Sequence, residues 1–327
     1  MYRLSVVGVL VFALSIASPL GENRAMSIDL GWIPNPSDFY GSVDYLRLRP
    51  RQGGLDFAIS DSDNDNNIEG PINRLNYDSE SGVRARLGLA LTSEWDLSFG
   101  YTRLRTDAAA SVDAPAGGQL WITQSNPASF NNSATNASAE IALDYDLYDL
   151  QAGYWFRPSK TVFINLFGGP RGALIHQSSE VAYTGGTVTE TRTQTQKTEL
   201  EGFGVRLGGE VQWQLASMIN VFASSSATMI VGNFDIEYVE SEPAIATGNV
   251  ATSSNFYDSV SNFEAVAGIS LGTDRISVQA GYELSNWLNI DRRLLFTGSP
   301  SISRGQLTST AEDMLLDGLF LRLALAY

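Results

Sequence analysis

The last ten residues of the chain, from Gly318 to Tyr327, alternate strictly between two kinds of side chain. One parity is entirely apolar and ends on the terminal aromatic residue: Leu319, Leu321, Leu323, Leu325 and Tyr327. A period of two is typical of a β-strand whose two faces meet different surroundings. About ten residues is also the length that a tilted strand needs to cross a bilayer. The pattern favours a membrane-spanning strand over its alternative, a core strand of a soluble β-sandwich.

The same alternation recurs along the chain in pairs of segments joined by short turns. The clearest pair runs from Gly82 to Tyr101 through a turn at residues 92–94. Arg84 and Arg86 have the parity opposite to the apolar face. Placing them in lipid would cost about 2–4 kcal/mol each near the membrane midplane. We therefore expect both arginines to point into the interior of a barrel.

Short and long connections between these segments alternate. Short turns are predicted near residues 93, 158, 217 and 274, and long loops near residues 65, 120, 187, 245 and 300. Bacterial outer-membrane barrels have short periplasmic turns and long external loops. Aromatic residues beside the short turns would form an interfacial girdle: Trp95, Phe156, Trp213 and Tyr327. The sequence predicts an all-β, transmembrane, antiparallel up-and-down barrel in the bacterial outer membrane, with about 10 strands and with about 8 or 12 as alternatives.

Several segments give more local expectations. Residues 39–49 read as the first strand, but their apolar residues lie on both parities: Val43 and Tyr45 on one, Leu46 and Leu48 on the other. A β-bulge would bring them to one face. The acidic residues around Tyr145 suggest a second bulge. Four polar stretches are predicted to be loops: 106–138, 178–197, 233–260 and 288–312.

The N-terminus has the features of a secretory signal. Arg3 precedes the apolar run from Leu4 to Ala17, which is too short to span a membrane as a helix. Cleavage is predicted after Ala17, with a later site near Ala25 as an alternative. The domain prediction is a signal peptide at 1–17 and a single barrel domain at 26–327, against the alternative of an N-terminal membrane anchor.

The composition excludes several classes of function. The chain of 327 residues has no cysteine and one histidine, which excludes a disulfide framework, thiolate metal sites and histidine-rich metal centres. The net charge of −15 argues against nucleic acid as a partner, because phosphate binding needs clustered lysine and arginine. His176 lies close to Ser178 and Ser179, residue types that hydrolases use, but neighbours in sequence do not make a catalytic set. We predict no enzyme activity and no cofactor.

An acidic segment at 61–69 has some features of a calcium-binding loop. It lacks the glycine at the sixth position and the carboxylate at the twelfth, where Ile72 stands. A solvated acidic loop is the expectation, and the alternative is weak divalent-cation bridging to lipopolysaccharide. No metal site is predicted.

Several short motifs follow one another in a fixed order between residue 82 and the C-terminus. They are Gly82-Val83-Arg84, Gly168-Gly169-Pro170-Arg171, the run from Gly202 to Glu210, Ala280-Gly281-Tyr282-Glu283 with Trp287, and Asp317-Gly318. In this order they resemble the Legionella-type major outer-membrane protein family. The resemblance implies a pore-forming barrel of Gram-negative bacteria and brings no catalytic residues.

The inward parity predicts a set of pore-lining residues: Arg84, Arg86, Asp149, Gln151, Arg171, Arg206, Glu210, Glu264, Gln279 and Glu283. They either set ion selectivity or pair with one another across a narrow lumen, since side chains can largely fill a barrel of about ten strands. The predicted function is a porin-like pore for small hydrophilic solutes or ions. The alternative is a non-conducting barrel with a structural or adhesive role through its surface loops.

The expected partners follow from this prediction. They are outer-membrane lipids and lipopolysaccharide, small solutes, and the barrel-assembly machinery. That machinery would read the last strand as an assembly signal, through Leu319, Leu321, Leu323, Leu325 and Tyr327. A homo-oligomer is an open possibility.

Overall fold

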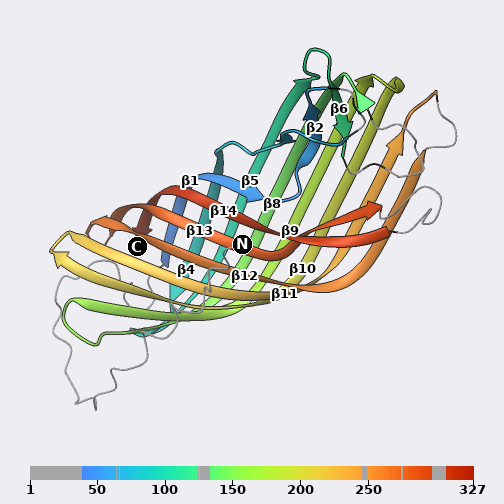
Figure 1. The fold of residues 1–327 in the computed structure, drawn as a ribbon. Helices are drawn as coiled ribbons and strands as arrows, with labels where there is room; N and C mark the ends of the chain where they lie inside the picture. The colour runs from blue at the N-terminus through green and yellow to red at the C-terminus, as the bar shows by residue number, and fades with distance from the viewer. Residues whose placement is uncertain are drawn as a thin grey trace.

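The chain folds into a closed antiparallel barrel (Figure 1). The computed structural model describes residues 39–63, 65, 67–123, 125, 133–244, 249–273, 275–296 and 307–327. Ten strands form the ring, in the order β1-β14-β13-β12-β11-β10-β9-β8-β5-β4. The prediction of an all-β up-and-down barrel is confirmed. The predicted signal segment lies outside the described residues, so its existence and cleavage stay predictions.

The ring strands differ in length. Their bounds are β1 Phe39–Gln52, β4 Glu80–Ala90, β5 Trp95–Asp113, β8 Asn136–Phe156, β9 Val162–Gly185, β10 Val188–Ala216, β11 Ile219–Ser241, β12 Val250–Gly272, β13 Ile276–Phe296 and β14 Leu307–Ala326. Strand β1 pairs with β4 on one side and with β14 on the other, so the ring leaves no open edge. A closed ring satisfies the backbone groups that an edge strand would expose to lipid.

A belt of apolar side chains covers the outside of the barrel near the short turns. Leu87, Leu207 and Leu319 are more than half exposed there, as residues that face lipid must be. The predicted aromatic girdle is also present on the outer surface, where Trp95, Phe156, Trp213 and Tyr327 are exposed. A second row of aromatic residues follows at the other edge of the belt: Tyr45, Tyr101, Tyr148 and Tyr282. The two rows mark the two interfaces of a membrane.

Beyond the second row, charged side chains replace apolar ones on the outer surface. Arg105 lies 2.9 Å from Asp144, and Arg103 lies 4.0 Å from Asp146. These acids do not mark a bulge, because the register of β8 against β5 is unbroken from Tyr154 to Asn136. The bulge expected around Tyr145 is therefore wrong. The two acids keep the outward parity of the strand but lie beyond the apolar belt.

The bulge expected in the first strand is also wrong. Strand β1 keeps one register against both β4 and β14 along its whole paired length. Val43 and Tyr45 face outward, whereas Leu46 and Leu48 are buried on the inner face. Both faces of this strand are apolar at this level because the barrel interior is apolar there as well.

Much of the sequence predicted to be loop is strand. Residues 106–113, 178–185, 188–197, 233–241, 250–260, 288–296 and 307–312 belong to ring strands that continue beyond the apolar belt. They carry many Thr, Ser and Asn residues and lack the apolar outer face that marks the membrane segments. Threonine is well suited to strands, and water satisfies the outer face.

A small sheet fills the mouth of the barrel at the end away from the short turns (Figure 1). It contains β2 Asp56–Asp61, β3 Ile72–Arg74, β6 Gln119–Ile122 and β7 Ser133–Ala134, in the order β3-β2-β6-β7. We call it the mouth sheet. Phe57 and Leu120 pack in one cluster with Ile141 from the inner face of β8. The Tyr183 hydroxyl of β9 donates a hydrogen bond to the Phe57 carbonyl at 2.5 Å. The two connections β1–β4 and β5–β8 thus fold inward.

The apolar belt gives a direct test of the inward and outward assignments. Replacing Leu207 by arginine is expected to lower the free energy of unfolding by about 2–4 kcal/mol, because a charge would enter lipid. Glu201→Arg is the matched control, since Glu201 has the same parity on β10 but lies beyond the belt. Its effect should stay below about 1 kcal/mol. Urea unfolding in lipid vesicles measures both, and equal effects would contradict the assignment.

Candidate functional site in the barrel lumen

Charged side chains from both edges of the closed ring meet in the lumen. Asp44 on β1 lies between Arg84 and Arg322, its cross-strand partners on β4 and β14. The Arg322 Nε atom is 2.7 Å from Asp44, and the Arg84 Nη1 atom is 3.3 Å from the same carboxylate. Arg84 also reaches Glu283 on β13, with 2.8 Å between Nη2 and Oε1. One buried acid therefore links the first strand to the last.

A second group of ion pairs occupies the opposite wall. Arg171 on β9 lies 2.6 Å from Asp149 on β8 and 2.9 Å from Glu264 on β12, and its side chain is only 2% exposed. Arg206 on β10 lies 2.6 Å from Glu264. Removing water from such charges is costly unless each has partners. Here every one of these groups has at least one partner of opposite charge.

We call these residues the ion-pair network: Asp44, Arg84, Asp149, Arg171, Arg206, Glu264, Glu283 and Arg322. Of the ten predicted pore-lining residues, Arg84, Asp149, Arg171, Arg206, Glu264 and Glu283 belong to it. Arg86, Gln151, Glu210 and Gln279 line a pocket nearer the short turns, where Arg322 of the network donates a hydrogen bond to Gln279 at 3.2 Å. All ten face the lumen, and the pairing interpretation describes most of them. Their role in conduction stays a prediction.

The sequence analysis missed Asp44 and Arg322. Both have the inward parity, opposite to Tyr45 and to the leucines of the last strand. The inward position of Asp44 was hidden because the parity of β1 was ambiguous. The alternation of residues 318–327 already placed Arg322 on the inner face, and that signal could have identified it.

An apolar layer fills the lumen between the ion-pair network and the mouth sheet. Six of its residues lie in one row of cross-strand neighbours: Leu46, Leu104, Tyr145, Ile175, Leu200 and Phe234, with Gly82 between the first two. Each is 5% exposed or less. Trp287 is fully buried in the same cluster and donates a hydrogen bond from Nε1 to the Tyr145 hydroxyl at 3.1 Å. Buried side chains from seven strands therefore pack together in this part of the lumen.

The order of these layers can be followed along the inner face of β8. From the short-turn end, its inward residues are Gln151 in the pocket, Asp149 in the ion-pair network, Tyr145 in the apolar layer and Ile141 against the mouth sheet. A solute that crosses the barrel would have to pass through each layer. The pocket and the ion-pair network are therefore on the periplasmic side of the apolar layer, and a separate buried ion pair, Arg192 with Glu242 at 2.7 Å, lies at the external end.

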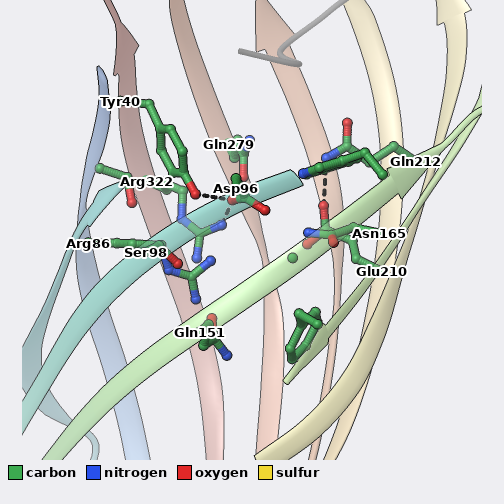
Figure 2. A pocket seen from close by; sticks show the side chains of 14 residues that line it. Tyr40, Arg86, Asp96, Ser98, Gln151, Asn165, Glu210, Gln212, Gln279 and Arg322 are labelled. Atoms are coloured by element: carbon green, nitrogen blue, oxygen red, sulfur yellow. Dashed lines mark hydrogen bonds between the residues drawn. The ribbon is translucent and has the colours of Figure 1, made fainter. Parts of the chain in front are cut away.

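The pocket opens on the short-turn side of the network. Its labelled residues come from eight strands (Figure 2): Tyr40, Arg86, Asp96, Ser98, Gln151, Asn165, Glu210, Gln212, Gln279 and Arg322. The Tyr40 hydroxyl donates to an oxygen of Asp96. Glu210 accepts a hydrogen bond from Gln212 at 2.5 Å. This pocket is lined by both charges and neutral amides.

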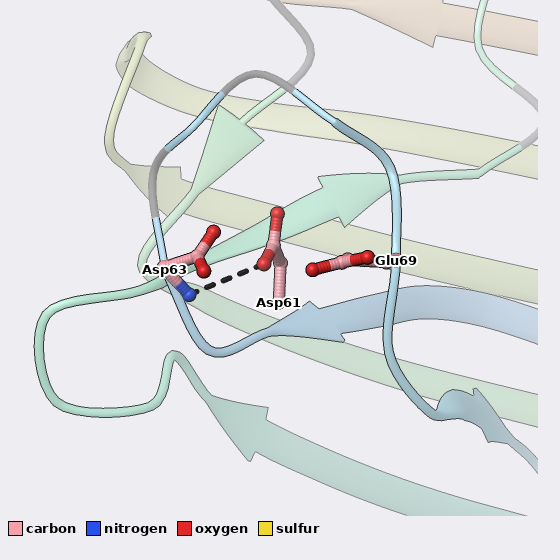
Figure 3. A group of neighbouring side chains, drawn as sticks. All are labelled: Asp61, Asp63 and Glu69. Carbon is pink, nitrogen blue, oxygen red and sulfur yellow. Dashed lines mark hydrogen bonds between the residues drawn. The ribbon is translucent and has the colours of Figure 1, made fainter.

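The acidic segment at 61–69 lies at the edge of the mouth sheet. Carboxylate oxygens of Asp61, Asp63 and Glu69 lie within 4.8 Å of one another (Figure 3). Trp121 donates a hydrogen bond to Asp61 at 2.8 Å. This bond lowers the pKa of Asp61, so that carboxylate is charged at neutral pH. Among the described residues it is the one group of acids close enough to hold a cation, and cation binding there stays a prediction.

His176 does not form a catalytic set with its neighbours. It lies on the outer parity of β9, where its cross-strand partners are Asp144 and Glu199. No hydrogen bond joins it to Ser178 or Ser179 in the part of the chain that the structure describes. The absence of enzyme activity stays a prediction. Within the described ranges there is also no helix long and apolar enough to cross a membrane.

Comparison with known proteins identifies the family of this barrel. Residues 33–327 match the family model described as the Legionella pneumophila major outer membrane protein precursor. The match confirms the resemblance predicted from the motifs. No curated protein matches the chain.

Three solved outer-membrane proteins are similar to this chain to different degrees, and one of them has the same kind of fold. The outer membrane protease OmpT from Escherichia coli has a TM-score of 0.52 and 9% sequence identity, over 90% of this chain and 98% of that one. OprG from Pseudomonas aeruginosa has a TM-score of 0.31 and 8% identity, over 90% and 99% of the two chains. Ail from Yersinia pestis has a TM-score of 0.29 and 10% identity, over 89% and 99%. At this identity the likeness to the protease concerns the fold alone.

Proposed function

Because this chain belongs to the family of the Legionella pneumophila major outer membrane protein and lies in the bacterial outer membrane, we propose that it works as a closed barrel anchoring a β-structure at the cell surface. The observation that carries this proposal is the apolar layer across the lumen. It favours the second of the two functions expected from the sequence, the non-conducting barrel with a surface role.

Opening a path through the apolar layer would be costly. Wetting one buried leucine or phenylalanine side chain costs about 1.5–3 kcal/mol. The layer has contributions from β1, β5, β8, β9, β10, β11 and β13, so a continuous path would expose several such side chains at once. The mouth sheet packs against the same cluster and would also have to move. A closed lumen is therefore the stable state.

The part of the barrel beyond the apolar belt is large enough to act as a surface structure. Strand β10 continues from Glu201, at the edge of the belt, to Val188. At about 3.3 Å per residue this is roughly 40 Å of strand. Strands β8, β9 and β11 extend in the same direction. Their outer faces carry hydroxyl, amide and acidic groups, which suit contact with water and with polar partners at the cell surface.

Passive conduction is the second candidate function. The pocket and the ion-pair network make the periplasmic half of the lumen polar and charged, as a solute path requires. Conduction would need the apolar layer and the mouth sheet to move. Lipopolysaccharide, the assembly machinery and a possible homo-oligomer remain expected partners under both functions.

Planar-bilayer recording separates the two functions. The purified wild-type barrel is expected to give no steady channels at protein amounts where a known porin inserts readily. A variant with Leu104→Ala and Trp287→Ala should open intermittently, because it removes bulk from the apolar layer without touching the ion pairs. Steady conductance from correctly folded wild type would contradict the closed barrel and support the pore.

A further inference from the structure

One arginine in the lumen lacks a partner. Arg86 on β4 makes no hydrogen bond or ion pair with any described residue, whereas Arg84, Arg171, Arg206 and Arg322 are all paired. It lines both the pocket and the space beside the ion-pair network. Figure 2 shows its guanidinium group on one side of the pocket. A guanidinium group with free donors in a narrow polar cavity is a ready site for a carboxylate.

Acidic groups with free bonding capacity lie elsewhere on the pocket wall. Glu210 is on β10, which three strands separate from β4 in the ring, and Figure 2 places it on the side opposite Arg86. Among the described residues it accepts one hydrogen bond, from Gln212, and has no cation within ion-pair distance. Asp96 is 8% exposed, and its Oδ1 atom is buried without a partner in the described chain.

Neutral groups around the pocket also have unused bonding capacity. The Gln151 Nε2, Trp155 Nε1 and Asn165 Oδ1 atoms are buried and have no hydrogen-bond partner among the described residues. Glycine at position 153 leaves room for the Asp96 and Asn165 side chains, because a Cβ atom there would lie 2.0 Å from Asp96 Oδ1 and 3.0 Å from Asn165 Oδ1. Buried polar atoms of this kind are costly when unsatisfied. Their presence together in one cavity indicates a place for a polar guest.

The charges decide which guest fits. A simple anion would pair with Arg86 but would be repelled by Glu210 and Asp96. A simple cation would pair with the two acids but would be repelled by Arg86. We propose that the pocket binds a small zwitterion that carries both a carboxylate and an ammonium group. The carboxylate bonds to Arg86, the ammonium group lies between the two acids, and the buried amides bond to the remaining polar atoms.

This site is independent of the proposed closed state of the barrel. The pocket lies on the short-turn side of the apolar layer, so a solute reaches it from the periplasm without crossing that layer. Binding therefore neither requires conduction nor excludes it. The two proposals can fail separately, one in a bilayer recording and the other in a binding measurement.

Calorimetric titration of the purified full-length barrel in detergent tests the site. The probes are the ω-amino acids glycine, β-alanine, 4-aminobutyrate and 6-aminohexanoate, whose charges are held at increasing distances. Acetate, butyrate, methylammonium and butylammonium are the single-charge controls. At least one ω-amino acid is expected to bind roughly tenfold more tightly than every control, the equivalent of about 1.4 kcal/mol.

Variants locate the binding on these residues. Arg86→Gln and Glu210→Gln should each weaken binding of the preferred probe roughly tenfold. Arg105→Gln, which removes an exposed arginine on the outer surface, should leave it unchanged. Heat-modifiable migration in gels shows that each variant is folded, and Glu210→Gln keeps the test decisive if Arg86→Gln fails to fold. Equal binding of a single-charge control, or no binding by any ω-amino acid, would overturn the proposal.

Discussion

Replacing Arg171 by methionine is expected to lower the free energy of unfolding by about 3–5 kcal/mol, because it removes a cation that is buried between two carboxylates. The methionine side chain fills a similar volume but leaves Asp149 without its closest cation. Glu264 retains one partner, Arg206, at 2.6 Å. The cost arises because Asp149 then keeps only Arg206, at 3.8 Å, and a buried carboxylate that has lost its close partner is far less stable than the same group in water. Urea unfolding of the refolded barrel in lipid vesicles measures it.

Two further variants separate lost pairing from lost packing. Arg171→Met together with Asp149→Asn should recover part of the stability, because the carboxylate that has lost its closest cation is then removed. Arg105→Met breaks an exposed ion pair on the outer surface and should cost less than about 1 kcal/mol. A loss for Arg171→Met that is no greater than the loss for Arg105→Met would mean that the lumen is wet around the ion-pair network.

The parts of the fold that face lipid were the parts that the sequence predicted well. Lipid tolerates only apolar side chains, so the alternation in residues 318–327 and in the hairpin around residue 93 could be interpreted directly. The number of strands, the short turns and the inward direction of Arg84 and Arg86 followed from that one constraint. The outer-membrane location followed from the same features, and the family match supports it.

The interior was harder to predict because it is not uniformly polar. Parity separates two faces only when they meet different surroundings, and β1 faces lipid at Tyr45 and the apolar layer at Leu46. The prediction that the external strand segments are loops was wrong for a related reason. Their inner faces pack on the mouth sheet, which is built from β2 and β6, segments well separated in sequence. Neither contact leaves a local signal in the sequence.

Contacts that depend on ring closure also could not be predicted from the sequence. Arg322 and Asp44 are 278 residues apart and become neighbours only in the register that joins the last strand to the first. The same register sets which charges of the lumen pair and leaves Arg86 without a partner. The inward direction of the predicted residues could therefore be inferred from parity, but their pairing required the closed barrel, and their role in a pore stays a prediction.

Deleting Leu325, Ala326 and Tyr327 is expected to reduce the folded barrel in the outer membrane roughly tenfold or more, which is at least about 1.4 kcal/mol of lost stability. The Tyr327 amide donates to the Phe39 carbonyl at 2.8 Å, and the Phe39 amide donates to the Tyr327 carbonyl at 3.1 Å. On the other side of β14, the Ala326 amide donates a hydrogen bond to the Arg275 carbonyl at 2.9 Å. The deletion therefore opens both seams of β14 at the end that closes the ring, and it exposes strand edges to lipid.

Substitutions at the last residue separate the backbone contribution from that of the side chain. Tyr327→Phe keeps an aromatic group at the membrane interface and should assemble like wild type. Tyr327→Asp keeps the backbone bonds to Phe39 but places a charge beside lipid and alters the predicted assembly signal, so it should assemble poorly. Surface labelling and heat-modifiable migration measure folded protein in each case. Wild-type amounts of folded Tyr327→Asp protein would show that closure of the ring depends on the strand pairing alone, and that the terminal aromatic residue is not part of an assembly signal.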